Sequence, residues 1–135
     1  MTRAAMAALL ALAVLVAACS PSSPASPSSA ARPSSPAVVT IVEPAPNQVF
    51  SADTVHVVLR LEHAQIVSQT TTNLKPDEGH VHLYVDNVVV SMNYGLEQDL
   101  PVHPGTYLLK AEFVATDHAP FNPRVFSSEL VFVVH

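Results

Sequence analysis

The chain has 135 residues, of which only 13% are charged, and the charges are unevenly distributed. All eleven acidic side chains lie in residues 38–135, together with only four basic ones. A nucleic-acid-binding surface needs the opposite balance, so this class of protein is excluded. The three glycines, Gly79, Gly95 and Gly105, are too widely spaced to build a glycine-rich phosphate-binding loop.

Residues 1–18 are typical of a secretory signal peptide. Arg3 supplies positive charge, and the uncharged stretch 4–18 is shorter than the roughly 20 apolar residues that span a bilayer. The sequence Leu15-Val16-Ala17-Ala18 precedes Cys19 and resembles a bacterial lipobox, which implies lipidation of Cys19 and removal of the leader. We therefore expect an exported lipoprotein, anchored through acyl chains to the extracytoplasmic face of the bacterial cell membrane. A plain secretory signal with a chance cysteine is the alternative.

Residues 19–37 are predicted to form a disordered tether. Residues 20–37 contain eight serines and five prolines, a composition that buries too little apolar surface to offset the entropy of folding. Cys19 is the only cysteine, so its lipidation leaves no disulfide and no cysteine nucleophile. One domain, residues 38–135, remains, and packing alone must stabilise it.

The domain is predicted to be all-β, because valine, threonine and aromatic residues dominate and no segment shows sustained helical periodicity. Asp86-Asn87 is predicted to be a two-residue hairpin turn. About seven short strands at this spacing predict an immunoglobulin-like or fibronectin-like β-sandwich. The expected strands are 38–43, 54–62, 65–68 (as an extension or partner of the strand before it), 80–86, 88–92, 105–115 and 125–134.

The segment from Pro104 to Phe113 supports the sandwich prediction. A Pro-Gly turn is followed by Tyr107, which stands early in a strand of alternating apolar residues. This arrangement resembles the tyrosine corner of such sandwiches, in which the phenol forms hydrogen bonds to the backbone across the turn. Tyr107 is therefore interpreted as a fold residue and not as a catalytic one.

All seven histidines lie in the domain, and two of them share one strand. Period-2 alternation places His80 and His82 on the face opposite Val81 and Leu83. Their Cα atoms are then about 6.6–7 Å apart. Two imidazoles at this spacing can bind one zinc or copper ion, but two ligands alone make a weak site.

The expected topology offers a third imidazole. If strands 80–86 and 105–115 are antiparallel neighbours, the beginning of the first lies at the same end as the loop that follows the second. That loop, residues 116–123, contains Asp117 and His118.

We therefore hypothesise a copper or zinc site formed by His80, His82 and His118, with Asp117 as a ligand or an orienting group. The alternative is that these histidines are structural and form hydrogen bonds to neighbouring backbone groups. The other histidines are expected to be ordinary surface, turn or terminal residues: His56, His63, His103 and His135.

No arrangement typical of an enzyme is present. The sequence contains no Gly-x-Ser-x-Gly nucleophile elbow, and its carboxylates are scattered. The acidic pair Asp77-Glu78 is interpreted as a solvated turn. We expect a non-enzymatic protein.

Three motifs between residues 79 and 134 carry a family resemblance. They consist of Gly79, His80, His82, Leu83 and Asp86; the turn Pro104-Gly105; and the loop residues His118, Pro120 and Pro123. The chain thereby resembles an uncharacterised exported bacterial domain family with a Gly-His-His-His-Leu-Leu-Ile-Asp signature, although Val81 and Phe121 stand where that family has further histidines. The resemblance implies an exported, mostly β domain and no particular activity. The histidine-rich signature suggests a metal such as copper.

Two functions are favoured, and a small-molecule carrier, which would need a sizeable apolar pocket, is a third alternative. One is a membrane-anchored, non-enzymatic binding module that contacts another envelope protein, an analogy at the level of the fold. The other is a copper- or zinc-binding lipoprotein that uses His80, His82 and His118.

Overall fold

The structure, a computed structural model, describes residues 31–135. The predicted signal peptide, Cys19 and the first part of the tether lie outside this range. The described residues form no helix, so none of them forms a helix long and apolar enough to cross a membrane. The strands are β1 (Val38–Glu43), β2 (Val49–Phe50), β3 (Thr54–Glu62), β4 (Gln65–Ile66), β5 (Glu78–Val85), β6 (Val88–Asn93), β7 (Glu97–Pro101), β8 (Gly105–Ala115), β9 (Pro120–Phe126) and β10 (Leu130–Val134).

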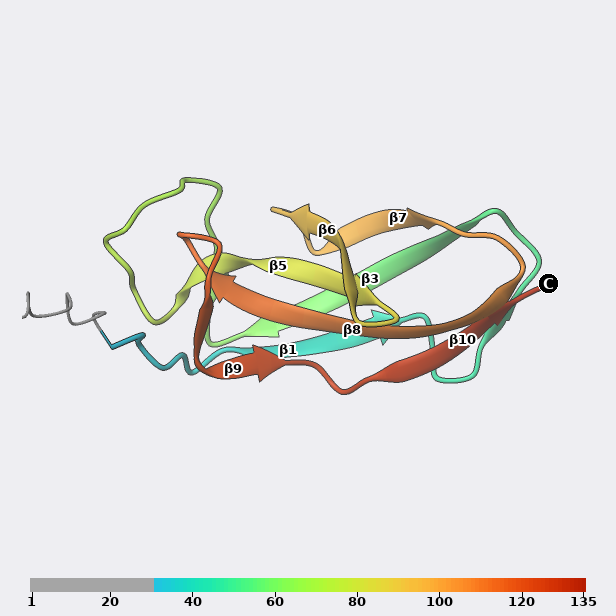
Figure 1. Cartoon of the computed structure of the whole chain (residues 1–135), viewed down its shortest axis with the longest axis horizontal. Helices are drawn as coiled ribbons and strands as arrows, with labels where there is room; N and C mark the ends of the chain where they lie inside the picture. The colour runs from blue at the N-terminus through green and yellow to red at the C-terminus, as the bar shows by residue number, and fades with distance from the viewer. Residues whose placement is uncertain (1–30) are drawn as a thin grey trace, which may run out of the picture. The chain divides into compact units, whose positions relative to one another are not determined.

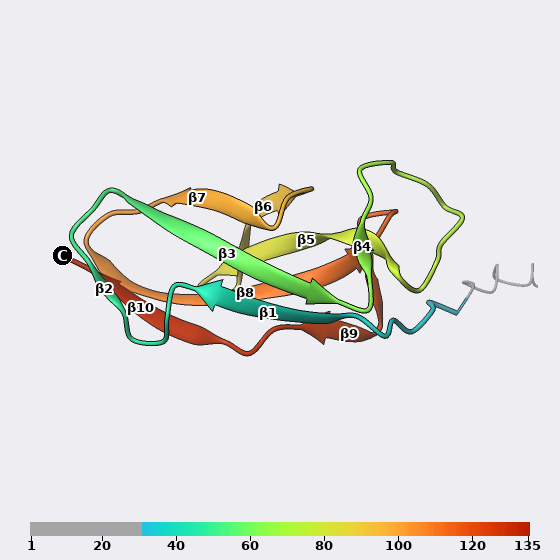
Figure 2. The same ribbon diagram turned by 180° about the vertical axis from the view of Figure 1, so that it is seen from behind.

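The strands form two layers, which confirms the predicted β-sandwich. The smaller sheet has the order β1-β3-β7 and lies in front of the larger one in Figure 2. The larger sheet has the order β2-β10-β8-β5-β4, with β6 also paired to β5 and β9 also paired to β8 (Figure 1). The pairs β2–β10 and β4–β5 are parallel, and the others are antiparallel.

Alternating side chains from both sheets fill the space between the layers. Val55 and Val57 of β3 and Val81 and Leu83 of β5 belong to this core, and all four side chains are fully buried. Each such burial contributes about 1.5–3 kcal/mol. The compact unit, residues 31–135, contains the whole of this core, so it carries its own hydrophobic stabilisation.

Several local predictions are confirmed. The bounds of β1, β3 and β8 are those expected, and β3 has the alternating burial of a half-buried strand. Asp86 and Asn87 have φ of 51° and 67°, the left-handed values of a type I′ hairpin turn. The Tyr107 hydroxyl donates to the His103 carbonyl (2.8 Å) and accepts from the His103 N–H (3.0 Å), which forms the tyrosine corner.

The prediction of one strand over 125–134 is wrong. The chain forms β9 and β10 instead, with a break between them at Ser127. The Ser127 hydroxyl accepts a hydrogen bond from the Ala111 N–H (2.9 Å), and the Ser127 N–H donates to the Ala111 carbonyl (2.8 Å). The Ser127 hydroxyl thus takes the place of a backbone carbonyl as the acceptor for the Ala111 N–H of β8, and the regular ladder is interrupted.

Strand β7 was not expected from the sequence. Its residues Glu-Gln-Asp-Leu-Pro are mostly polar, and only Leu100 is buried. The segment becomes a strand because it pairs with β3 from Thr54↔Pro101 to Val58↔Glu97. Tertiary pairing therefore overrides a weak local preference.

The compact unit begins at Ala31, seven residues before the expected boundary at Val38. The Arg32 guanidinium binds both carboxylate oxygens of Asp117, at 2.5 and 2.9 Å. The Asn122 N–H donates to the Pro33 carbonyl (2.9 Å). These bonds attach the last residues of the predicted tether to the domain.

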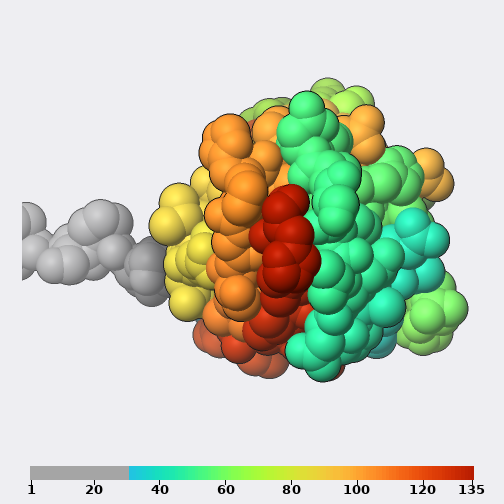
Figure 3. Space-filling view, turned by 90° about the vertical axis from the view of Figure 1, so that its right-hand side faces the viewer, coloured from blue at the N-terminus to red at the C-terminus, as the bar shows by residue number. Residues whose placement is uncertain are grey.

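The pairing of β5 with β8 places two distant segments at one end of the sandwich. It runs from Gly79↔Ala115 to Val85↔Leu109, which confirms the predicted antiparallel neighbours. The beginning of β5 and the turn after β8 therefore meet, and Figure 1 shows them at the end remote from the carboxyl terminus. Figure 3 views the opposite end, where β10 lies between β2 and the beginning of β8.

Gly79 permits the close approach of β5 and β8, because a Cβ there would lie 1.9 Å from the Val114 carbonyl oxygen. Gly79→Ala is therefore expected to lower the free energy of unfolding by about 3 kcal/mol, as overpacking does. Gly95→Ala is the matched control, since its Cβ would meet nothing closer than 3.5 Å. Urea unfolding of residues 20–135 measures both. Equal stability of the two variants would contradict the packing described.

Candidate metal centre

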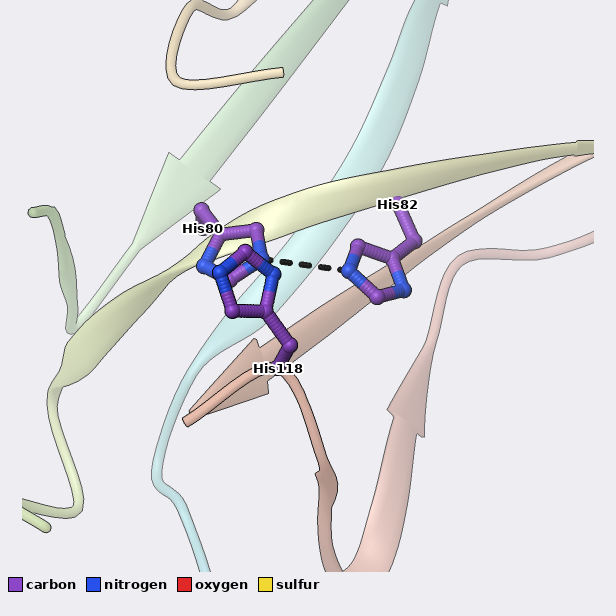
Figure 4. Close-up of side chains that lie close together, drawn as sticks. All are labelled: His80, His82 and His118. Carbon is purple, nitrogen blue, oxygen red and sulfur yellow. Dashed lines mark hydrogen bonds between the residues drawn. The ribbon is translucent and has the colours of Figure 1, made fainter. Parts of the chain in front are cut away.

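Three imidazoles converge at this end of the sandwich (Figure 4). His80 and His82 project from β5 on the face away from the core, as the alternation predicts. His118 comes from the tight turn after β8 and has a φ of 64°. The turn is closed by hydrogen bonds from the His118 N–H to the Ala115 carbonyl (3.0 Å) and from the Ala115 N–H to the Ala119 carbonyl (3.1 Å).

The distances suit a shared ion. One ring nitrogen from each histidine lies within 4.8 Å of the other two. The two Nε2 atoms of His80 and His82 are 3.1 Å apart. Nitrogen ligands at about 2.0–2.1 Å from a tetrahedral ion are about 3.3 Å apart, so this pair already has the required separation. The His118 ring centroid lies 4.3 Å from that of His80 and 6.2 Å from that of His82.

Burial keeps the two strand histidines neutral. His80 is 1% exposed and His82 is 7% exposed. Burial, and then the nearby His118 and His82 rings, lower the pKa of His80 to about 4. Burial also lowers the pKa of His82, against the opposing effect of the Glu112 carboxylate. At neutral pH both rings therefore keep the lone pairs that a metal requires.

His80 has an unpaired polar atom. Its Nε2 contacts His82, but its buried Nδ1 has no hydrogen-bond partner among the described residues. A buried polar group without a partner costs about 1–3 kcal/mol. The structural alternative, in which each histidine is satisfied by neighbouring backbone, therefore does not account for this side chain.

A buried carboxylate lies beside His82. Glu112 is directly opposite His82 on β8 and is 1% exposed. It accepts hydrogen bonds from Arg124 (2.6 and 2.7 Å) and from the Tyr84 hydroxyl (2.6 Å). Burial favours a higher pKa for Glu112, but these donors lower its pKa below the ordinary value and keep it ionised. Its negative charge favours a cation at His82, and the positive charge of Arg124 opposes this effect.

His118 is the exposed member of the group. The Thr70 and Tyr94 hydroxyls each lie 3.4 Å from its Nε2. The Tyr94 ring also lies 5.1 Å from the His80 ring and covers it. These long contacts leave the His118 ring only loosely held.

The structure does not bring Asp117 into the group of imidazoles. Its carboxylate is bound by Arg32 and also accepts from the Ala119 N–H (3.2 Å). The Arg32 hydrogen bonds hold the pKa of Asp117 below its usual range. Asp117 therefore fastens the turn that carries His118.

The alternation of the strand places Tyr84 on the face of His80 and His82, but four other polar side chains around the imidazoles were not identified from the sequence: Thr70, Tyr94, Glu112 and Arg124. Period-2 alternation along β8 would have placed Glu112 on the outer face. Its partner Arg124 lies on β9, and the expected strand began only at residue 125. The other histidines lie outside the cluster; His56, for example, contacts Asp99 at 2.8 Å.

Comparison of the chain with family models, with curated proteins and with solved structures gave no match. The proposed function therefore rests on the geometry of this cluster.

The metal-free chain is expected to lose stability in mild acid. The folded state keeps His80 neutral until the pH approaches its pKa of about 4, whereas the unfolded chain protonates it near 6.5. Between these values the unfolded state binds more protons, so the free energy of unfolding falls as the pH falls, by up to about 3 kcal/mol.

Urea unfolding of wild type and His80→Gln, with a chelator present and from pH 7 to 4, measures this loss. The variant cannot take up the proton, so the stability difference between the two proteins should change over this interval. A constant difference would contradict the low pKa of His80.

Proposed function

We propose that this chain is an exported metal-binding lipoprotein that holds a copper or zinc ion through His80, His82 and His118. The observation that carries the proposal is the convergence of three ring nitrogens, from two separate elements, within 4.8 Å. The burial of two of the rings and the 3.1 Å separation of their Nε2 atoms support it.

The donor set favours borderline and soft ions. Imidazoles suit zinc and copper, whereas Ca²⁺ and Mg²⁺ prefer oxygen ligands. The group contains three histidines and no carboxylate. Three protein ligands leave a fourth position of a tetrahedral ion free. We propose binding, storage or delivery of the ion, and no catalytic reaction.

The proposed location follows from the leader sequence. Lipidation at Cys19 would place the domain outside the cytoplasmic membrane, attached by a short serine- and proline-rich segment. Metal ions enter a cell through this compartment, so a tethered binding domain there would meet them first.

Isothermal titration of Cu(II) and Zn(II) into residues 20–135, which lack Cys19, tests the function. We expect one ion per chain with a Kd below about 1 µM, equivalent to about 8 kcal/mol. His80→Ala/His82→Ala should abolish this binding. His56→Ala/His135→Ala is the matched control, because it removes two histidines outside the cluster, and it should bind as wild type does. Equal losses in both double variants would contradict the site.

His118 allows a test that spares the fold. Asparagine tolerates the left-handed φ of 64° at this position, so His118→Asn removes the imidazole without straining the turn. Its metal affinity should fall at least about tenfold, or ~1.4 kcal/mol, with an unchanged unfolding midpoint. Undiminished affinity in this variant would exclude His118 as a ligand.

The exposed apolar strand β6 supports a second function, which is contact with another envelope protein. This strand pairs only with β5 among the described strands, and three consecutive valines are exposed on it: Val88, Val89 and Val90. A photocrosslinking residue at position 90 in living cells should then give one defined adduct. The absence of any crosslinked adduct would contradict this function.

A further inference from the structure

Four strands of the larger sheet align one row of side chains across its outer face. Met92 of β6 is directly opposite His82 of β5, His82 is opposite Glu112 of β8, and Glu112 is opposite Phe126 of β9. Directly opposite residues of antiparallel strands project from the same face, with Cβ atoms about 4.5–5.5 Å apart. The Met92 side chain therefore begins beside the His82 imidazole.

Met92 is unusual in two respects: no other methionine follows the leader, and its side chain is exposed. It is the only methionine after the leader, since the other two are Met1 and Met6. It is 58% exposed, although methionine is an apolar residue that ordinarily fills gaps in cores. Core packing therefore does not explain why the thioether is at this position.

The Met92 thioether can reach the site. Its unbranched side chain has three rotatable bonds, and its exposure leaves it free to turn toward His82. On the other side of His82, the ionised Glu112 is fully engaged by Arg124 and Tyr84, so it does not compete for the ion. Met92 is therefore placed to offer a further donor beside His82.

Thioether ligands discriminate between metals. Sulfur of this kind is soft and favours Cu(I), whereas zinc takes imidazole, thiolate or carboxylate ligands. Three imidazoles alone do not separate zinc from copper, but three imidazoles and a thioether favour copper and retain it in its reduced form.

We propose that Met92 is the fourth ligand of the site and makes it specific for copper, with Cu(I) as the ion that depends on the thioether. This inference rests on the proposed function, because it requires the three histidines to bind metal. It adds the identity of the ion and a residue that sets that identity.

The test compares Cu(I) and Zn(II) binding by residues 20–135 in wild type and Met92→Leu. Leucine keeps the apolar volume and removes the sulfur. Competition with a chromophoric Cu(I) chelator should show at least a tenfold loss of Cu(I) affinity in the variant, while its Zn(II) affinity changes less than twofold. X-ray absorption at the copper edge should show one sulfur neighbour in wild type and none in the variant.

Val88→Leu is the matched control, because it changes another exposed apolar side chain of β6, at the end of the strand that pairs with Val85 and not with His82. It should bind Cu(I) as wild type does. Cu(I) affinity within twofold of wild type in Met92→Leu, with only nitrogen neighbours around copper, would overturn the role of Met92 and leave the histidine site intact. A wild-type chain that binds neither ion would overturn both proposals.

Discussion

The antiparallel pairing of β5 with β8 determines both the packing of the core and the position of the histidines. Its register turns Val81 and Leu83 into the sandwich and His80 and His82 away from it. A slip of one residue would reverse every side chain on β5, so the core enforces the outward placement of the imidazoles. Gly79 lets the backbones approach where the pairing starts. The same pairing brings the turn that carries His118 to the beginning of β5.

Three polar side chains on the outer face of this sheet, those of His80, His82 and Glu112, are buried almost as completely as the core, which is costly for polar groups. Glu112 is compensated by Arg124 and the Tyr84 hydroxyl, and this group of side chains is fully hydrogen-bonded. His80 is not compensated, because its Nδ1 is unpaired. No described residue pairs with this atom, so the burial of His80 costs the metal-free chain stability. An ion bound through the other ring nitrogen would offset that cost, because a ligand that binds only the folded state stabilises it. The fold thus keeps His80 and His82 neutral at some expense in stability.

Local patterns predicted much of the fold, and topology predicted the site. Alternation was sufficient for β3 and β8, and the Pro-Gly turn before Tyr107 was sufficient for the tyrosine corner. The three histidines were brought together by reasoning that β5 and β8 are neighbours. Features that depend on distant partners were not predictable. The polar β7 is a strand only because β3 pairs with it, and Ser127 divides the last strand only because of its bonds to Ala111. Arg32 lies 85 residues from Asp117, so no local pattern in the sequence joins them.

The central claim is that the three imidazoles share one ion. A crystal structure of residues 20–135 grown with Cu(II) or Zn(II), with anomalous diffraction recorded at the edge of that metal, tests it most directly. We expect one strong anomalous peak at about 2.0–2.1 Å from a ring nitrogen of each of His80, His82 and His118. A peak at other residues, such as His56 and Asp99, with none among the three imidazoles would contradict it.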